Sequence, residues 1–121
     1  MKPQILRHLI IALLMLTGVF HLAIALLGGA GAYGAGVAIM GVVYSGLGFW
    51  VRRDVTMLGD AAGRHSIIGT VAITSLVLAV GGGYYLTNGG PGVLAFLFLI
   101  DVAIIGAGAL WLFQTYSAKT R

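Results

Sequence analysis

The sequence has no cysteine, no glutamate and few charged residues of any kind. Without cysteine, the chain has no disulfide, no thiolate metal site and no cysteine nucleophile. Charged residues make up 8% of the 121 residues, whereas soluble domains carry about 25% because their surfaces must be hydrated. Hydrophobic residues make up 60%, and the mean hydropathy is +1.04. A water-soluble domain is therefore excluded.

Most of the sequence consists of long runs of apolar residues. A helix needs about 20 apolar residues to cross a bilayer. Four apolar runs occur, at about 5–27, 37–51, 66–85 and 93–113, of which the second is the shortest. The first run imitates a secretory signal, but it is longer than the apolar region of a signal peptide. We therefore expect an all-α integral membrane protein, with residues 1–121 forming a single domain: an up-and-down bundle of four transmembrane helices.

The basic residues predict the orientation of this bundle. Residues 28–36 and 86–92, which join the first two and the last two runs, have no lysine or arginine. Cytoplasmic segments are enriched in these residues. We therefore expect a multi-pass protein of a bacterial inner membrane in which the N-terminus, the C-terminus and the loop at 52–65 are all cytoplasmic (N-in/C-in). The net charge of +4 then reflects topology and indicates no nucleic-acid partner. The seven basic residues are Lys2, Arg7, Arg52, Arg53, Arg64, Lys119 and Arg121.

One acidic residue, Asp101, lies near the middle of the fourth apolar run. An ionisable side chain at that depth costs at least ~2.5–3.5 kcal/mol on insertion scales. In hydrocarbon, a carboxyl group either takes up a proton or pairs with a cation. His21 is the only side chain at a similar depth that can become cationic, so we expect the two to pair.

Other polar residues lie at similar depths. Counted at 1.5 Å per residue from the outer end of each helix, Asp101 lies roughly 12 Å deep, His21 roughly 9 Å and Tyr44 roughly 10 Å. Thr74 and Ser75 lie about one turn deeper, at roughly 15–16 Å. We call these five residues the polar layer, and we expect Tyr44 to donate its hydroxyl to the carboxyl group.

The polar layer has two interpretations. Its members are either interhelical contacts, each worth about 0.6 kcal/mol on average, or a site for a proton, a cation or another ligand, because ionisable groups inside membranes are functional by default. His8 and His65 begin two helices at the same edge, and two facing histidines are the minimum for axial haem ligation. Interfacial histidines beside Arg7 and Arg64 are the simpler explanation. No metal site is predicted, and no cofactor is assigned.

The leading functional prediction is a non-enzymatic accessory or scaffolding subunit that packs into a larger membrane complex. Its basis is the small size, the scarcity of extramembrane residues and the 20 glycines, whose small faces permit close contact with other subunits or with a second copy. The first alternative is an oligomeric proton-linked carrier or channel for a small solute, using Asp101 and His21. The second is a haem- or quinone-binding redox subunit with His8, His65 or His21 as ligands.

In size and number of spans the chain is similar to the small multidrug resistance exporters and to the fluoride channels. The exporters depend on a glutamate in their first helix, which this chain lacks, and the asparagine and phenylalanine pattern of the channels is also missing. The general layout, with a histidine late in the first helix and basic residues after the second, resembles bacterial DoxX-like proteins. No motif is specific enough to transfer a residue role from any of them.

Overall fold

The computed structural model describes residues 2–58 and 64–120, with side chains for 2–55 and 64–115. Within these ranges the chain forms helices and no strand. Four helical stretches are long and apolar enough to cross a membrane. They are α1 (Pro3–Leu26), η1 (Gly31–Tyr33) with α2 (Gly34–Leu58), the continuous series α3 (Arg64–Val77), η2 (Leu78–Gly82) and α4 (Gly83–Asn88), and α5 (Gly92–Thr120).

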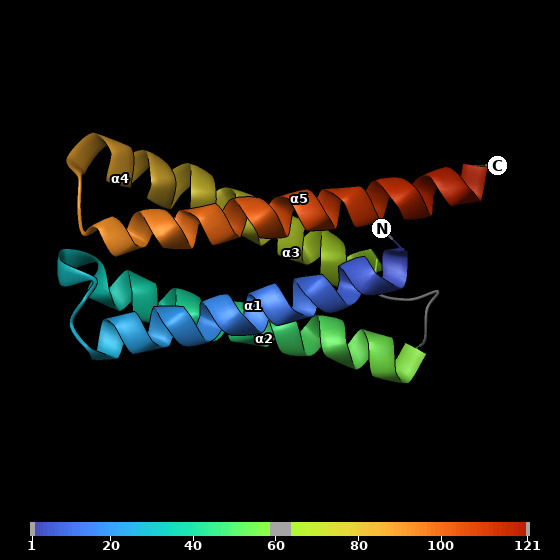
Figure 1. The fold of residues 1–121 in the computed structure, drawn as a ribbon, viewed down its shortest axis with the longest axis horizontal. Helices are drawn as coiled ribbons and strands as arrows, with labels where there is room; N and C mark the ends of the chain where they lie inside the picture. The colour runs from blue at the N-terminus through green and yellow to red at the C-terminus, as the bar shows by residue number, and fades with distance from the viewer. Residues whose placement is uncertain (1, 59–63, 121) are drawn as a thin grey trace.

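These helices form two antiparallel hairpins that lie side by side (Figure 1). The first hairpin consists of α1 and α2, and the second of α3–α4 and α5. The turns of both hairpins lie at one end of the bundle, which we call the turn end. Both chain termini lie at the opposite end, which we call the terminal end (Figure 1).

The second helix is longer than the sequence predicts. We expected it to end near residue 51 and to be followed by a loop at 52–65, but α2 continues to Leu58 and α3 already begins at Arg64. The basic pair that follows the apolar run does not stop the helix, because arginine is a good helix former. Residues 59–63 of the expected loop lie outside the described residues.

The third helix changes its geometry at the turn-end side of the bundle. Its segment η2 is π-helical and contains Gly81 and Gly82, two of three consecutive glycines. A Cβ atom on Gly81 would lie 3.6 Å from the ring of Phe98 in α5. This is an ordinary van der Waals distance, so η2 packs against α5 at this ring. π-helical turns occur frequently at functional sites.

Glycines also bring α1 and α2 together. A Cβ atom on Gly41 would lie 2.7 Å from the side chain of Leu22, and one on Gly48 would lie 2.7 Å from the sulfur of Met15. Close approach at small residues is the usual basis of helix packing in membranes. Gly46 differs, because no described atom lies within 4 Å of its Cβ position.

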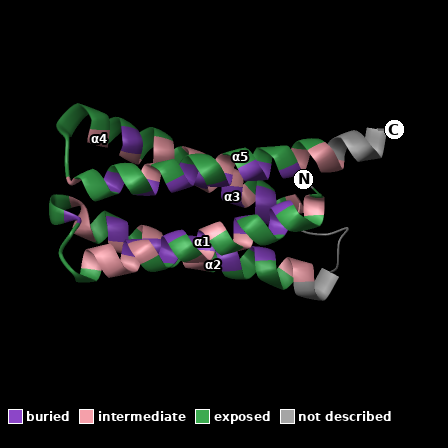
Figure 2. Cartoon of the chain, viewed as in Figure 1, coloured by how far each residue is buried: buried purple, intermediate pink, exposed green. Residues whose placement is uncertain are grey.

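Aliphatic side chains fill the centre of the bundle, with the larger cluster toward the terminal end. Leu14, Ile67 and Ile104 belong to this cluster, and none of them has exposed surface. A smaller cluster near the turn end contains Val37 and Leu97. Buried residues alternate with exposed ones along α1, α2, α3 and α5 (Figure 2), and many exposed side chains are large and apolar. Such a surface suits contact with lipid rather than water.

Candidate functional site

A set of polar side chains is buried in this apolar bundle. Each is less than one-tenth exposed, and α1, α3 and α5 all contribute. Polar groups in an apolar interior are costly unless they find hydrogen-bond partners. Their contacts therefore show which of them form a site. The set is Arg7, Thr17, His21, Ser66, Thr70, Thr74 and Asp101.

Asp101 points into the bundle and is 1% exposed. The hydroxyl of Tyr44, in α2, donates a hydrogen bond to Asp101 Oδ1 at 2.8 Å, as the sequence predicts. Tyr44 has no exposed surface, so this bond joins the two hairpins through the core. The second carboxyl oxygen, Asp101 Oδ2, is buried without a hydrogen-bond partner among the described residues.

Among the described residues, His21 and Asp101 form no direct hydrogen bond with each other. His21 Nδ1 donates instead to the backbone carbonyl oxygen of Thr17 at 2.7 Å, with Thr17 Oγ1 3.2 Å from the same nitrogen. The carbonyl oxygen of Thr17, one turn earlier in the helix, lies within reach of the ring and accepts this hydrogen bond. Tyr44 contacts both predicted partners, because its ring packs against that of His21 with a centroid separation of 5.0 Å.

This hydrogen bond also determines which tautomer a neutral His21 ring adopts. Nδ1 must carry a proton to donate to a carbonyl oxygen, so a neutral His21 ring has its free lone pair on Nε2. Nε2 can then accept a hydrogen bond from a ligand. Because Thr17 and Tyr44 hold the ring on two sides, His21 has a defined orientation.

Of the two remaining members of the polar layer, only Thr74 is fully buried. Its hydroxyl lacks a hydrogen-bond partner among the described residues, as does that of Thr70, one turn toward the terminal end. Ser75 is half-buried and does not belong to the buried set. Together with Asp101 Oδ2, the two threonine hydroxyls are buried oxygens of the core that lack a hydrogen-bond partner within the described part of the chain. Internal water normally fills such places.

A cavity of about 630 Å³ lies between the hairpins toward the turn end, and His21 forms part of its wall. Among its described lining residues, only His21, Tyr33 and Tyr84 carry a side-chain nitrogen or oxygen. The rest of the wall is apolar and comes from the three helical stretches other than α1, including Val37 and Met40 of α2. The complete lining is His21, Ala32, Tyr33, Gly36, Val37, Met40, Leu76, Val77, Val80, Gly81, Tyr84, Leu94, Leu97 and Phe98.

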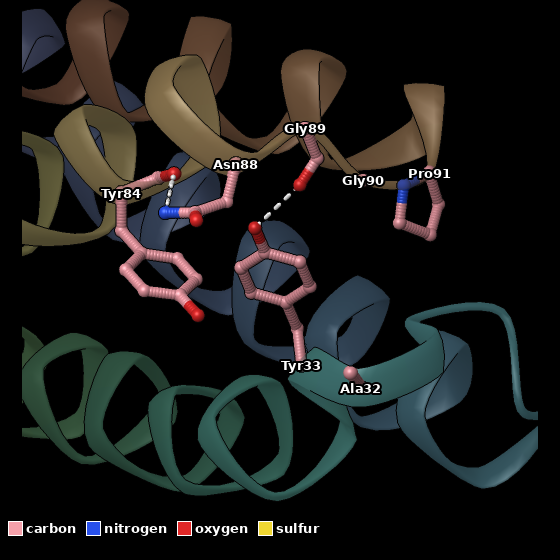
Figure 3. A pocket seen from close by; sticks show the side chains of 7 residues that line it. All are labelled: Ala32, Tyr33, Tyr84, Asn88, Gly89, Gly90 and Pro91. Carbon is pink, nitrogen blue, oxygen red and sulfur yellow. Dashed lines mark hydrogen bonds between the residues drawn. The ribbon is translucent and has the colours of Figure 1, made fainter.

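Tyr33 connects the two turns at the turn end. Its hydroxyl donates to the carbonyl oxygen of Gly89 at 2.6 Å, and its ring meets that of Tyr84 edge-on at 5.7 Å (Figure 3). A Cβ atom on Gly90 would lie 2.8 Å from the Tyr33 ring, so the turn has room for this ring only because it carries glycine. A shallow pocket of about 330 Å³ lies over this contact. Tyr33 is not among the residues predicted from the sequence, although it is an isolated aromatic residue in the glycine-rich stretch 28–36, which is a usable signal.

The weaker histidine candidates lie apart from the cavity. His8 is exposed, and its Nδ1 donates to the carbonyl oxygen of Gln4 in its own helix. His65 is also exposed, and neither residue lines the cavity. Across the described residues there is no group of three or more histidine, aspartate or glutamate side chains that could hold a metal ion.

Arg7 is buried, although the sequence placed it in a peripheral tail. It is 1% exposed, and its guanidinium carbon lies 6.0 Å from the ring centroid of Trp111. This distance is at the limit of a cation–π contact. The side chain therefore contributes to the packing between α1 and α5 at the terminal end.

Comparison with known proteins gives no family for this chain: no family model matches the sequence, and neither a curated protein nor a solved structure matches it. The function is therefore inferred from the cavity and the buried polar residues. Two features define the candidate site. One is the apolar cavity with His21 in its wall, and the other is the Tyr44–Asp101 hydrogen bond behind it.

Proposed function

We propose that this chain is an integral protein of a bacterial inner membrane that binds a small, largely apolar molecule inside its own helical bundle. The distribution of lysine and arginine supports an orientation with both termini in the cytoplasm. The turn end, with the cavity, then belongs to the outer half of the membrane. The proposed role is ligand binding without chemical conversion.

The observation that carries this proposal is the cavity with His21 in its wall. Sites for small molecules are typically cavities of about 300–1,000 Å³ with mostly apolar walls and a few well-placed polar groups. The volume of about 630 Å³ and a lining with three N- or O-bearing side chains among the described residues fit that description. Thr17 and Tyr44 hold His21 in place, which favours a preformed polar contact for a ligand.

The core between the cavity and the terminal end favours binding over conduction. A channel needs a continuous path, whereas Leu14, Ile67 and Ile104 fill this part of the bundle and have no exposed surface. A carrier would need a second conformation that opens this core. Haem held by His8 and His65 is also less well supported, because neither histidine lines the cavity.

The test is to purify the chain in native lipid and to identify co-purifying small molecules by mass spectrometry. Met40→Trp places a large ring in the cavity and should remove the bound molecule. Val42→Trp is the matched control, because Val42 lies on the same helix with 65% of its side chain exposed. Equal recovery of the molecule from the two variants, or no molecule from the wild-type chain, would contradict the proposal.

An accessory subunit of a larger complex is the second candidate. It is supported by Gly46 in α2 and Gly106 in α5, which are exposed and have no described atom within 4 Å of their Cβ positions. Such positions leave room for a helix of another chain. Asp101 does not contribute to that surface, because it points inward. Stoichiometric partners after mild solubilisation would support this role, and their loss in Gly106→Leu would locate the contact.

A further inference from the structure

We propose that the cavity takes its ligand sideways from the bilayer, between α2 and the η2–α4 segment, and that this ligand is a lipid-soluble molecule with a hydroxyl or N–H group at one end. This inference rests on the proposed function and specifies the route and the class of ligand. Three observations support it: the cavity is covered at the turn end, it is open at the side, and His21 forms part of its wall.

The turn end is covered by aromatic side chains. The Tyr33 hydroxyl is bonded to Gly89 of the opposite turn, and Tyr84 packs against the Tyr33 ring (Figure 3). Tyr85 adds a second contact to Tyr33, with ring centroids 6.3 Å apart, and its hydroxyl donates to the Pro91 carbonyl oxygen. We call Tyr33, Tyr84 and Tyr85 the tyrosine cover. A solute arriving from water at the turn end would meet this cover first.

The side of the bundle between α2 and η2–α4 is open. Leu76 and Val80 line the cavity, yet they are 64% and 66% exposed, so the cavity reaches the surface beside them. On the opposite edge, Gly36 also lines the cavity, is exposed, and has no described atom within 4 Å of its Cβ position. We call Gly36, Leu76 and Val80 the side mouth.

The position of the side mouth determines the class of ligand. All three of its residues are apolar, and it lies in stretches long and apolar enough to span a membrane. A charged solute would have to enter hydrocarbon to reach it, at a cost of several kcal/mol or more. A lipid-soluble molecule is already at that depth.

His21 sets the polar end of the ligand. Because Nδ1 donates to the Thr17 carbonyl oxygen, the neutral ring offers Nε2 as an acceptor. A matching ligand therefore carries a donor, such as the hydroxyl of an alcohol, a phenol or a hydroquinone. Its apolar part would lie along Val77 and Phe98 toward the side mouth.

The experiment uses the full chain in liposomes with two photoactivatable diazirine probes. One is a long-chain alcohol that dissolves in the bilayer, and the other is a charged probe that stays in water. Peptide mass spectrometry locates the labelled residues. We expect the alcohol to label cavity residues such as Met40, and the charged probe to leave them unlabelled.

Substitutions at the side mouth test the route. Val80→Trp should lower cavity labelling by the alcohol about tenfold, which corresponds to about 1.4 kcal/mol. Leu110→Trp is the matched control and should label like wild type, because Leu110 is exposed and does not line the cavity. Leu76→Trp repeats the test at a second exposed position, in case the first variant is poorly folded.

The outcomes separate the route from the proposed function. Cavity labelling by the charged probe, or labelling by the alcohol that neither side-mouth variant lowers, would overturn side entry and leave ligand binding intact. If the alcohol does not label the wild-type cavity, while Met40→Trp and Val42→Trp retain the same co-purified molecule, then the cavity is not a binding site and both proposals fail.

Discussion

Removing the Tyr44 hydroxyl tests whether the buried Tyr44–Asp101 contact stabilises the bundle. Tyr44→Phe keeps the ring that packs on His21 and deletes only the donor to Asp101 Oδ1, at 2.8 Å. Hydrogen bonds inside membrane proteins are worth about 0.6 kcal/mol on average and about 1.7 kcal/mol at most. For Tyr44→Phe we expect a loss of stability larger than this average, because a buried acceptor left without its partner costs about 1–3 kcal/mol.

After this change both carboxyl oxygens would be unpaired, since Asp101 Oδ2 already has no hydrogen-bond partner among the described residues. We therefore expect Tyr44→Phe to lower the free energy of unfolding by about 2 kcal/mol. Removing both polar partners should cost less, because apolar groups of similar shape leave nothing unpaired. The double variant Tyr44→Phe with Asp101→Leu should therefore be more stable than Tyr44→Phe alone.

The measurement is reversible unfolding in detergent or bicelles, monitored by circular dichroism for the wild-type chain, both single variants and the double variant. Together these give the coupling free energy between the two positions. A loss below about 0.5 kcal/mol for Tyr44→Phe, the scale of an ordinary surface substitution, would refute the reasoning. The carboxyl group would then have to be satisfied by other means, such as internal water.

Two further predictions concern helix packing and orientation. Gly41→Ala should lower the free energy of unfolding by about 1–3 kcal/mol through overpacking, because the new methyl group meets Leu22 at 2.7 Å; Gly46→Ala, measured by the same unfolding assay, should leave stability unchanged or slightly higher. Because the chain has no cysteine, Asn88→Cys and Lys2→Cys each introduce a unique thiol. With both termini cytoplasmic, an impermeant maleimide on intact cells should label Asn88→Cys and not Lys2→Cys, and the reverse pattern would invert the proposed topology.

The sequence was sufficient to predict four helices, because the four apolar runs are separated from one another by glycines or charges; the second run, at 37–51, is shorter than the helix that contains it. It was also sufficient to bring Tyr44 and Asp101 to one level, since the rise of 1.5 Å per residue fixes depth along a helix. The helix bounds were less predictable. The polar residues 52–54 continue α2, and composition alone does not separate a polar helix end from a loop.

The partner of His21 could not be predicted, because depth does not give rotation about the helix axis. α5 is apolar almost all round, so its periodicity does not identify the face that packs inward. The backbone carbonyl oxygen of Thr17 also competes with Asp101 as the acceptor for the Nδ1–H group of His21. Because every residue has a backbone carbonyl, the sequence does not indicate which one is used. Arg7 was misplaced for a related reason: a charged residue near a terminus usually lies in water, whereas here its side chain packs against Trp111.

The π-helical segment η2 has a consequence for the far end of its helix. A π-helical turn holds one more residue than an α-helical turn, so every side chain beyond Gly82 is rotated by about 100° relative to an uninterrupted α-helix. Tyr84 and Tyr85 lie just beyond this point and meet Tyr33. Forcing Leu78–Gly82 into α-helical geometry without removing a residue would therefore turn both rings away from Tyr33, whereas deleting one residue would restore an α-helix and leave the rings facing it. The way the two turns fit together therefore depends on matching the number of residues in this segment to its helical geometry.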